Sequence, residues 1–169
     1  MMKVGMLTGP FGQEPLDTVL NFAQQARISC LEVVAHPGSR HVDPTQFNAA
    51  QAKQIRAALE SHGLEISSLA YYDAGISKPD RTKAVQDHAK KTIDAAALLG
   101  VKTVCMLAGF PADGLSKIDT IRKVLPDAFR PVLAHASKKK VNIALENWYS
   151  TCLQGLDTFE CLFECIPDD

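Results

Sequence analysis

Five short apolar runs rich in β-branched residues recur along this chain, and the stretch between each run and the next has the periodicity of a helix. The runs begin near residues 3, 30, 64, 101 and 141. Such an alternation of strand and helix predicts parallel strands joined by right-handed helical crossovers. The expected strands are residues 3–7, 30–34, 64–69, 102–107 and 141–145. We therefore expect an α/β protein of about five strand–helix units.

Capping residues and prolines predict several helix boundaries. Asp43 is an N-cap residue followed by a proline, so a helix is expected to begin there and to end at Gly63. Pro126 and Pro131 fall within residues 115–139. Because proline disrupts a helix interior, this stretch is expected to contain a short helix, a break and a second helix.

The composition excludes several classes of protein. The chain has 169 residues, of which 46% are hydrophobic and 22% are charged, as in an ordinary globular domain. The 18 basic and 19 acidic residues are evenly distributed, so no nucleic-acid partner is expected. The sequence has neither a signal-peptide pattern nor an apolar run long enough to span a membrane, so we expect a cytoplasmic protein. Five cysteines without CxxC spacing are expected to be free thiols.

Residues that follow parallel strands gather at one end of the sheet, where such folds place their ligands. His36, Arg40 and His41 follow the second strand, around a Pro-Gly-Ser turn, and could together bind a substrate phosphate or hydroxyl. A mobile polar loop is the alternative. Other expected substrate-binding residues at this end are Tyr71, Asn147 and Trp148.

Glu146 comes directly after the apolar residues of the fifth strand. A carboxylate at this position lies on the rim of the sheet, where an unpaired buried charge is costly without a partner such as a metal ion. From the residues alone, Glu146 could be a metal ligand, a catalytic acid–base or a salt-bridged structural glutamate. Glu32, in the middle of the second strand, is expected to face the interior of the barrel or sheet, where a structural hydrogen bond or ion pair is at least as plausible as a functional role.

Residues 141–147, with the sequence Val-Asn-Ile-Ala-Leu-Glu-Asn, resemble the fifth strand of the xylose isomerase-like TIM-barrel superfamily, the sugar-phosphate isomerase/epimerase group. Residues 28–33, 63–69 and 99–104 resemble the second, third and fourth strands of that family. The resemblance implies a carbohydrate substrate and a divalent metal ion, Mn, Mg, Co or Zn, with Glu146 as a ligand and as one of the proton-transferring carboxylates. It also implies that the other three ligands lie on strands six to eight, so this chain is expected to bind no metal and to be inactive.

Two departures from family patterns narrow the expected activity. The three-zinc nucleases of this superfamily carry histidines after strands three and four, where this chain has Tyr71 and Tyr72 and then Ala108 and Gly109. The ketose 3-epimerases carry a second glutamate six residues after the metal-binding one, where this chain has Cys152. A nuclease is therefore not expected, and the epimerase activity is in doubt.

A complete barrel of about 250 residues has about 31 residues per unit, so five units predict about 156 residues. We therefore expect residues 1–169 to be the single N-terminal part of a barrel, a partial (β/α)8 fold without strands six to eight. The first and fifth strands would then be open edges, which a homo-oligomer would cover. The alternative is a flavodoxin-like doubly wound domain, a binding or signalling module with strand order 2-1-3-4-5 and helices on both faces.

Overall fold

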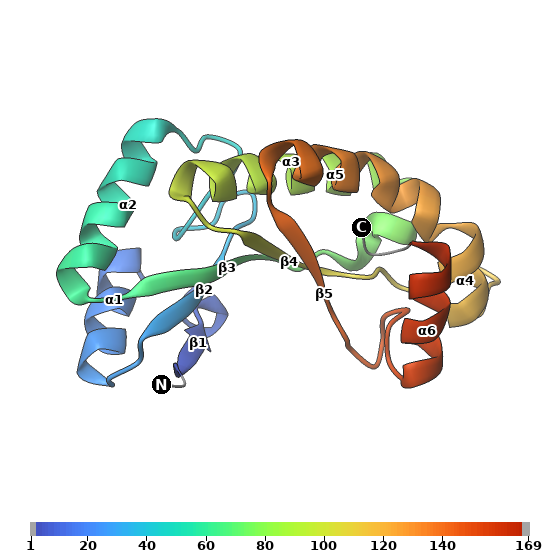
Figure 1. Ribbon diagram of the computed structural model, residues 1–169, viewed down its shortest axis with the longest axis horizontal. Helices are drawn as coiled ribbons and strands as arrows, with labels where there is room; N and C mark the ends of the chain where they lie inside the picture. Colours follow the sequence, from blue (N-terminus) through green and yellow to red (C-terminus); the bar gives the residue numbers. More distant parts are fainter. Residues whose placement is uncertain (1–2, 167–169) are drawn as a thin grey trace.

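The computed structural model describes residues 3–166, which form one five-stranded parallel sheet in the order β1-β2-β3-β4-β5. The strands are β1 Gly5–Leu7, β2 Cys30–Val34, β3 Glu65–Tyr71, β4 Thr103–Leu107 and β5 Asn142–Glu146. Figure 1 shows a strongly curved sheet with the helices along its outer side. The sequential order confirms a partial barrel and excludes the doubly wound alternative, whose first strand would lie between the second and third.

Within residues 3–166, five α-helices and two short 3-10 turns connect the strands, and a sixth α-helix follows β5. The helices are α1 Leu16–Gln25, α2 Ala49–His62, α3 Thr82–Leu99, α4 Lys117–Lys123, α5 Leu125–Lys139 and α6 Leu156–Cys165, and the turns are η1 Gly9–Phe11 and η2 Ala74–Ser77. In the part of the chain that the structure describes, no helix combines the length and the apolar character needed to cross a membrane.

The N-terminus of α2 differs from the prediction. The cap is Asn48, whose side chain accepts hydrogen bonds from the backbone N–H groups of Ala50 and Gln51, while the Gln51 side chain accepts one from the Asn48 N–H. This reciprocal capping box starts the helix at residue 49. Asp43 instead accepts hydrogen bonds within the preceding loop, from Gly38 N–H among others. The helix ends at Gly63, as predicted, with the left-handed conformation at φ 65°.

The region between the fourth and fifth strands contains the expected break, since α4 ends at Lys123 and α5 begins at Leu125. Pro126 lies in the first turn of α5, where its missing N–H would have had no partner within the helix. Pro131, however, lies inside α5 rather than at a break. The buried side chains of Phe129 and Val132 on either side of it hold this helix against the core, which offsets the one hydrogen bond that proline removes.

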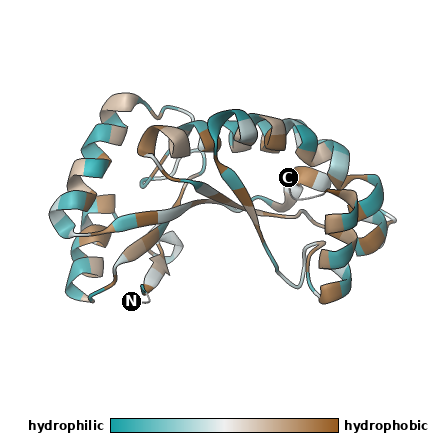
Figure 2. Cartoon of the chain, in the orientation of Figure 1, coloured by the Kyte–Doolittle hydropathy of each residue, from teal (hydrophilic) through white to brown (hydrophobic). Residues whose placement is uncertain are grey.

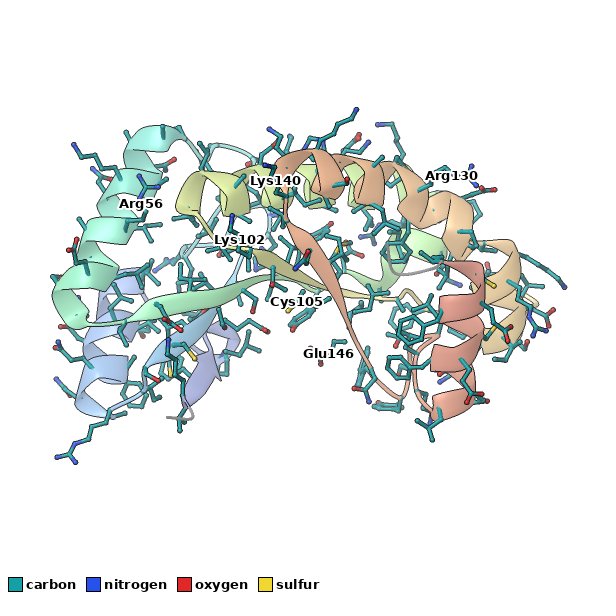
Figure 3. The ribbon with its side chains drawn as sticks, in the orientation of Figure 1. Arg56, Lys102, Cys105, Arg130, Lys140 and Glu146 are labelled. Carbon is teal, nitrogen blue, oxygen red and sulfur yellow. The ribbon has the colours of Figure 1, made fainter. Side chains whose placement is uncertain are left out.

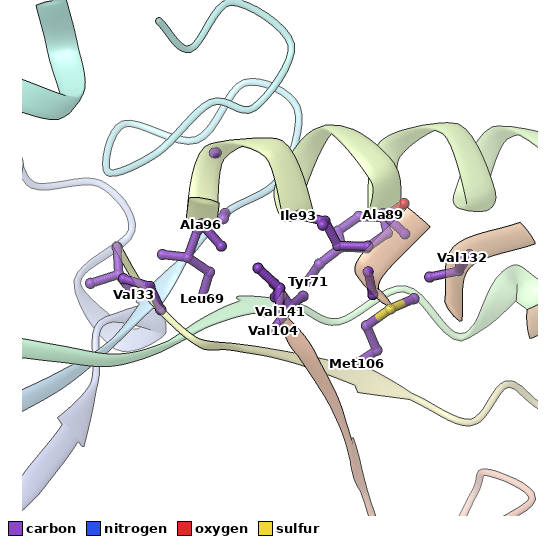
Figure 4. Packing of buried hydrophobic residues seen from close by; sticks show 14 of the residues in the cluster. Val33, Leu69, Tyr71, Ala89, Ile93, Ala96, Val104, Met106, Val132 and Val141 are labelled. Carbon is purple, nitrogen blue, oxygen red and sulfur yellow. The ribbon is translucent and has the colours of Figure 1, made fainter. Parts of the chain in front are cut away.

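The hydrophobic core lies between the outer face of the sheet and the helices. Alternate residues of the central strands point outward into it, and Val33, Leu69, Val104 and Met106 are all fully buried. They pack with Ile93 and other apolar residues of α3 and α5 in one cluster (Figure 4). Figure 2 shows both hydrophobic and hydrophilic residues along each helix, as expected for helices with one face against a sheet.

β1 and β5 are the two outermost strands, so the expected open edges are present. Residues of β5 alternate between exposed and half-buried, whereas the last four residues of β3, in the centre of the sheet, are all buried. The concave face, opposite the helices, therefore carries side chains that remain accessible at both edges.

Candidate active site at the carboxyl ends of the strands

The loops at the carboxyl ends of the strands surround a cleft of about 960 Å³. Four of the predicted substrate-binding residues line it, namely His36, Arg40, Tyr71 and Trp148. Glu146, Asn147 and His41 lie outside its lining. The structure thus brings together at one cleft residues from three loops that are far apart in the sequence.

His41 is buried and both of its ring nitrogens are used within the protein. Nδ1 accepts a hydrogen bond of 2.9 Å from the Thr8 hydroxyl, and Nε2 donates one of 3.2 Å to the Glu14 carbonyl. Thr8 in turn accepts a hydrogen bond from the Val34 N–H. Burial lowers the pKa of His41, although the hydrogen bond to the Glu14 carbonyl opposes this effect. These contacts join the loops after β1 and β2, so in this structure His41 supports the wall of the cleft.

Arg40 and His36 form part of that wall. Nη1 of Arg40 donates a hydrogen bond of 2.7 Å to the Gln13 carbonyl, which fixes the guanidinium between the loops that follow β1 and β2. Nδ1 of His36 lies 2.9 Å from the Pro37 carbonyl and must donate to it, because a carbonyl oxygen can only accept. Both side chains are exposed at the cleft.

A second polar group lies where the cleft meets α3. The Tyr71 hydroxyl is 3.5 Å from both Asp73 Oδ2 and His88 Nδ1, and Nη2 of Arg81 is 2.8 Å from Asp73 Oδ2. Burial, followed by the neighbouring Asp73 charge, raises the pKa of Tyr71. His88 lies on α3, away from the strand ends, and lines the cleft with the other three residues.

Aromatic side chains form the far side of the cleft. Trp148 packs with Phe110 at a ring-centroid distance of 6.1 Å and with Tyr149 at 5.3 Å. Nζ of Lys117 on α4 lies 2.5 Å from both the Tyr149 carbonyl and Oε1 of Gln154. This lysine therefore fixes the loop after β5 that carries Trp148.

Glu146 lies on the concave face of the sheet. It pairs in register with Leu107 of β4, and side chains two residues apart on a strand point to the same face, so Glu146 shares that face with Cys105. Figure 3 labels both residues beneath the sheet, on the side away from the helices. The carboxylate is therefore on the inner side of the curved sheet, and it is exposed there.

A hydrogen-bonded group on the same face includes the second carboxylate. Oε1 of Glu32 accepts a hydrogen bond of 2.6 Å from the Tyr72 hydroxyl, and Oε2 accepts one of 2.9 Å from the Ser68 hydroxyl. Burial raises the pKa of Tyr72 well above its usual range, and the neighbouring carboxylates of Glu146 and Glu32 add to this shift. Tyr72 donates its one proton to Glu32 and lies close to Glu146. The structural hydrogen bonds expected for Glu32 are present.

Cys105 of β4 belongs to this group. Burial raises the pKa of its thiol to about 11, the charges of Glu32 and Glu146 add to the shift, and a hydrogen bond with Ser68 opposes it. Alternation along the strands could have placed Cys105 on the inner face. The partners of Glu32 could not have been identified, because they lie 36 and 40 residues further along the chain.

Cys152 occupies the position where the ketose 3-epimerases carry a second glutamate. It is fully buried, and its backbone N–H donates a hydrogen bond of 2.8 Å to the Gly109 carbonyl. Gly109 has φ 84°, and a Cβ atom there would come within 2.7 Å of the Ser77 hydroxyl. This part of the structure is tightly packed and contributes no polar group to the cleft.

The described residues do not form a complete metal site. Within residues 3–166, no three histidine, cysteine, aspartate or glutamate side chains are close enough together to hold an ion. Glu32 has both carboxylate oxygens hydrogen-bonded to neighbouring hydroxyls, which leaves Glu146 as a single candidate ligand. One carboxylate falls short of the ligand sets by which proteins hold divalent ions.

A curved parallel sheet in sequential order, with its polar residues at the carboxyl ends of the strands, defines the (β/α)-barrel class. A comparison with known families identifies the family within that class. The model of the family described as xylose isomerase-like TIM barrel matches residues 20–166, and the chain belongs to this family.

Individual proteins similar to this chain are longer than it. The uncharacterized protein YfiH of Bacillus subtilis (strain 168) is 30% identical over 117 residues, which make up 67% of this chain and 37% of YfiH. Three solved structures, each 15% identical, share the fold. They are the probable 3-DHS dehydratase AsbF of Bacillus anthracis (TM-score 0.77; 99% of this chain, 60% of that one), a xylose isomerase-like TIM barrel protein of Mycobacterium smegmatis in complex with magnesium (0.73; 100% and 64%), and the D-psicose 3-epimerase of Clostridium cellulolyticum H10 with D-tagatose (0.70; 99% and 67%).

Proposed function

We propose that this chain is part of a carbohydrate isomerase or epimerase, in which Glu146 moves a proton at a carbon next to a carbonyl group. The observation that carries the proposal is the position of Glu146, at the carboxyl end of β5 and on the concave face, where its carboxylate is exposed beside Tyr72. A general base must come within hydrogen-bond reach of the proton that it removes, and an exposed rim carboxylate meets that condition. The sugar-binding epimerase among the similar structures supports the same substrate class.

The cleft residues are proposed to bind this substrate. Trp148 offers an aromatic face to the apolar side of a sugar ring, and Asn147 lies next to Glu146 in the chain. His36, Arg40 and Tyr71 supply hydrogen-bonding groups on the opposite side of the cleft, while His41 supports their loop through its bonds to Thr8 and Glu14.

We propose further that Glu146 is one ligand of a divalent ion, Mn, Mg, Co or Zn, and that the other ligands come from outside residues 3–166. Such an ion, when bound, polarises the substrate carbonyl and so acidifies the adjacent C–H group. With one carboxylate ligand, residues 1–169 alone are expected to bind no ion and to be inactive, so Glu146 is tested in a chain that also contains strands six to eight. Residues 1–169 would then be the N-terminal part of a barrel, and self-association would cover β1 and β5.

The proposal is tested by comparing the wild type with Glu146→Gln, both in this longer chain. Free Mn²⁺ is measured by electron paramagnetic resonance, and exchange of substrate C–H protons in D₂O is followed by NMR for a panel of ketoses. Glu146→Gln is expected to weaken Mn²⁺ binding by about ten-fold or more and to abolish exchange, since loss of a metal ligand removes both effects. Glu60→Gln, on the exposed outer face of α2, is the matched control and is expected to behave as wild type. Equal Mn²⁺ binding and equal exchange in the wild type and Glu146→Gln would refute the proposal.

A further inference from the structure

The charged groups that line the cleft are not balanced. Arg40 and Arg81 face a single carboxylate, Asp73, and the two histidines of the lining can only add positive charge. Arg81 is already paired with Asp73 at 2.8 Å. Asp73 also accepts a hydrogen bond from the Gly75 N–H at 2.8 Å, so it is engaged at both oxygens. The positive charge that remains in the cleft is that of Arg40.

No carboxylate neutralises Arg40 among residues 3–166, because it forms no ion pair there. Asp43 lies three residues away, but its oxygens accept hydrogen bonds from Gly38 N–H, Thr45 N–H and the Gln46 side chain at 2.9 to 3.0 Å. These bonds lower the pKa of Asp43, although partial burial acts to raise it. Asp43 therefore stabilises the fold of its own loop and leaves the Arg40 guanidinium without a counter-charge.

Arg40 is nonetheless held in place. One of its five N–H donors is used by the Gln13 carbonyl, and the others remain to bind a ligand. His36, four residues earlier in the same loop, donates from Nδ1 to the Pro37 carbonyl, so Nε2 of the neutral ring can only accept, for example from a hydroxyl group of the ligand. A guanidinium that is already anchored through one nitrogen loses less conformational freedom when it binds a ligand than a mobile one does. Its planar fork of N–H donors matches the oxygens of a carboxylate or phosphate.

We infer that Arg40 binds an anionic group of the substrate, a phosphate or a carboxylate, at the end of the molecule farthest from the reacting carbon. The inference rests on the proposed function, which leaves open whether the carbohydrate is neutral or charged. A hydroxyl group could accept one hydrogen bond from Arg40 but would leave its charge uncompensated. An anion satisfies both the charge and the remaining donors.

The position of the two loops is consistent with this arrangement. Arg40 follows β2 and Glu146 ends β5, so three strand spacings, about 14 Å in a flat sheet and less in a curved one, separate them. A substrate that reaches both residues is therefore extended across the cleft. It passes Tyr72, which follows β3, and approaches Trp148, which follows β5.

The inference is tested by titrating ¹⁵N-labelled protein with inorganic phosphate and, separately, with acetate, at pH 7 and constant ionic strength. We expect saturable amide shifts in residues 36–40 with at least one of the two anions, and the comparison tells a phosphate site from a carboxylate site. Arg40→Met is expected to weaken that binding by about ten-fold or more. Arg56→Met is the matched control, because Arg56 also donates to a backbone carbonyl, that of Leu98, but lies on α2 outside the cleft lining.

Absence of saturable shifts, or equal affinities in Arg40→Met and the wild type, would overturn the inference. This result is separable from the test of Glu146, which uses Mn²⁺ and neutral ketoses. If both anions fail while the Glu146 results hold, the substrate is a neutral carbohydrate and the proposed function stands. If an anion binds at Arg40 while Glu146→Gln changes nothing, the anion site stands and the isomerase proposal fails.

Discussion

The Tyr72 hydroxyl lies 2.6 Å from Oε1 of Glu32, so a residue just beyond β3 completes the hydrogen bonding of a carboxylate in the middle of β2. Ser68 occupies the other oxygen of Glu32. A carboxylate on the inner face of a sheet is stabilised when both oxygens are bonded, because each bond to the charged form offsets part of the cost of burial.

Replacing Tyr72 by phenylalanine removes this donor while keeping the ring. The free energy of unfolding, measured by urea denaturation, is expected to fall by about 1–2 kcal/mol, since hydrogen bonds to charged groups contribute about this much in a half-buried position. Tyr149→Phe is the control, because that side chain is 70% exposed and its loss of a hydroxyl leaves no buried carboxylate unpaired. Equal free energies for the two variants would show that the bond to Glu32 contributes nothing.

The stability of the protein should depend on the protonation of His41. Because burial holds the pKa of the folded-state imidazole below its usual 6.5, the unfolded chain binds the proton first as the pH falls. The free energy of unfolding is therefore greatest above pH 6.5 and decreases as the pH is lowered below it. Urea denaturation across this range should give a smaller decrease for His41→Gln than for the wild type. His36→Gln, in the same loop but exposed, should keep most of the wild-type dependence, because the His36 charge is the smallest of the effects on the pKa of His41.

Gly109 should not tolerate a side chain. An alanine there would combine a positive φ with a contact of 2.7 Å to the Ser77 hydroxyl, so we expect a loss of about 2–4 kcal/mol in the free energy of unfolding. Gly114→Ala separates the two causes, since Gly114 has φ 75° with nothing within 4 Å of the added carbon. Its expected cost is about 1–2 kcal/mol, from the backbone alone. A Gly109 variant no less stable than the Gly114 variant would contradict the close packing.

The Cys105 thiol should report the charge of Glu32. Burial is the largest cause of its raised pKa of about 11, and the Glu32 charge adds to it. Glu32→Gln is thus expected to lower this pKa without restoring the ordinary value, and to accelerate alkylation of Cys105 by iodoacetamide at a fixed pH. Peptide mass spectrometry measures the rate at each cysteine. Cys152 is an internal control, because its pKa, also about 11, is raised by burial without any contribution from Glu32. A parallel change at both thiols would indicate general loosening of the fold.

The apolar periodicity and the prolines of the sequence were sufficient to predict five parallel strands and the break before α5, whereas the sequential strand order was expected from the family resemblance. The strands and the break depend on local properties, the apolar periodicity of each segment and the effect of proline on its own turn. The start of α2 was predicted incorrectly, because Asp43 and Asn48 both carry the local signal of a helix cap. The choice between them is made by the loop, in which Ala35 forms an isolated bridge with Val42 and Asp43 bonds to Gly38.

The sequence by itself determined which residues stand at the carboxyl ends of the strands, and so identified Glu146, Arg40 and Trp148 as candidates. The tertiary structure alone decided which of the candidates have free polar atoms. His41 is joined to Thr8 and Glu14, and Glu32 to Ser68 and Tyr72, across 27 to 40 residues of sequence. Hydrogen bonds act over about 3 Å in space, whereas sequence patterns report on neighbours along the chain. The pairing of β1 with β2 and of β2 with β3 brings these partners together.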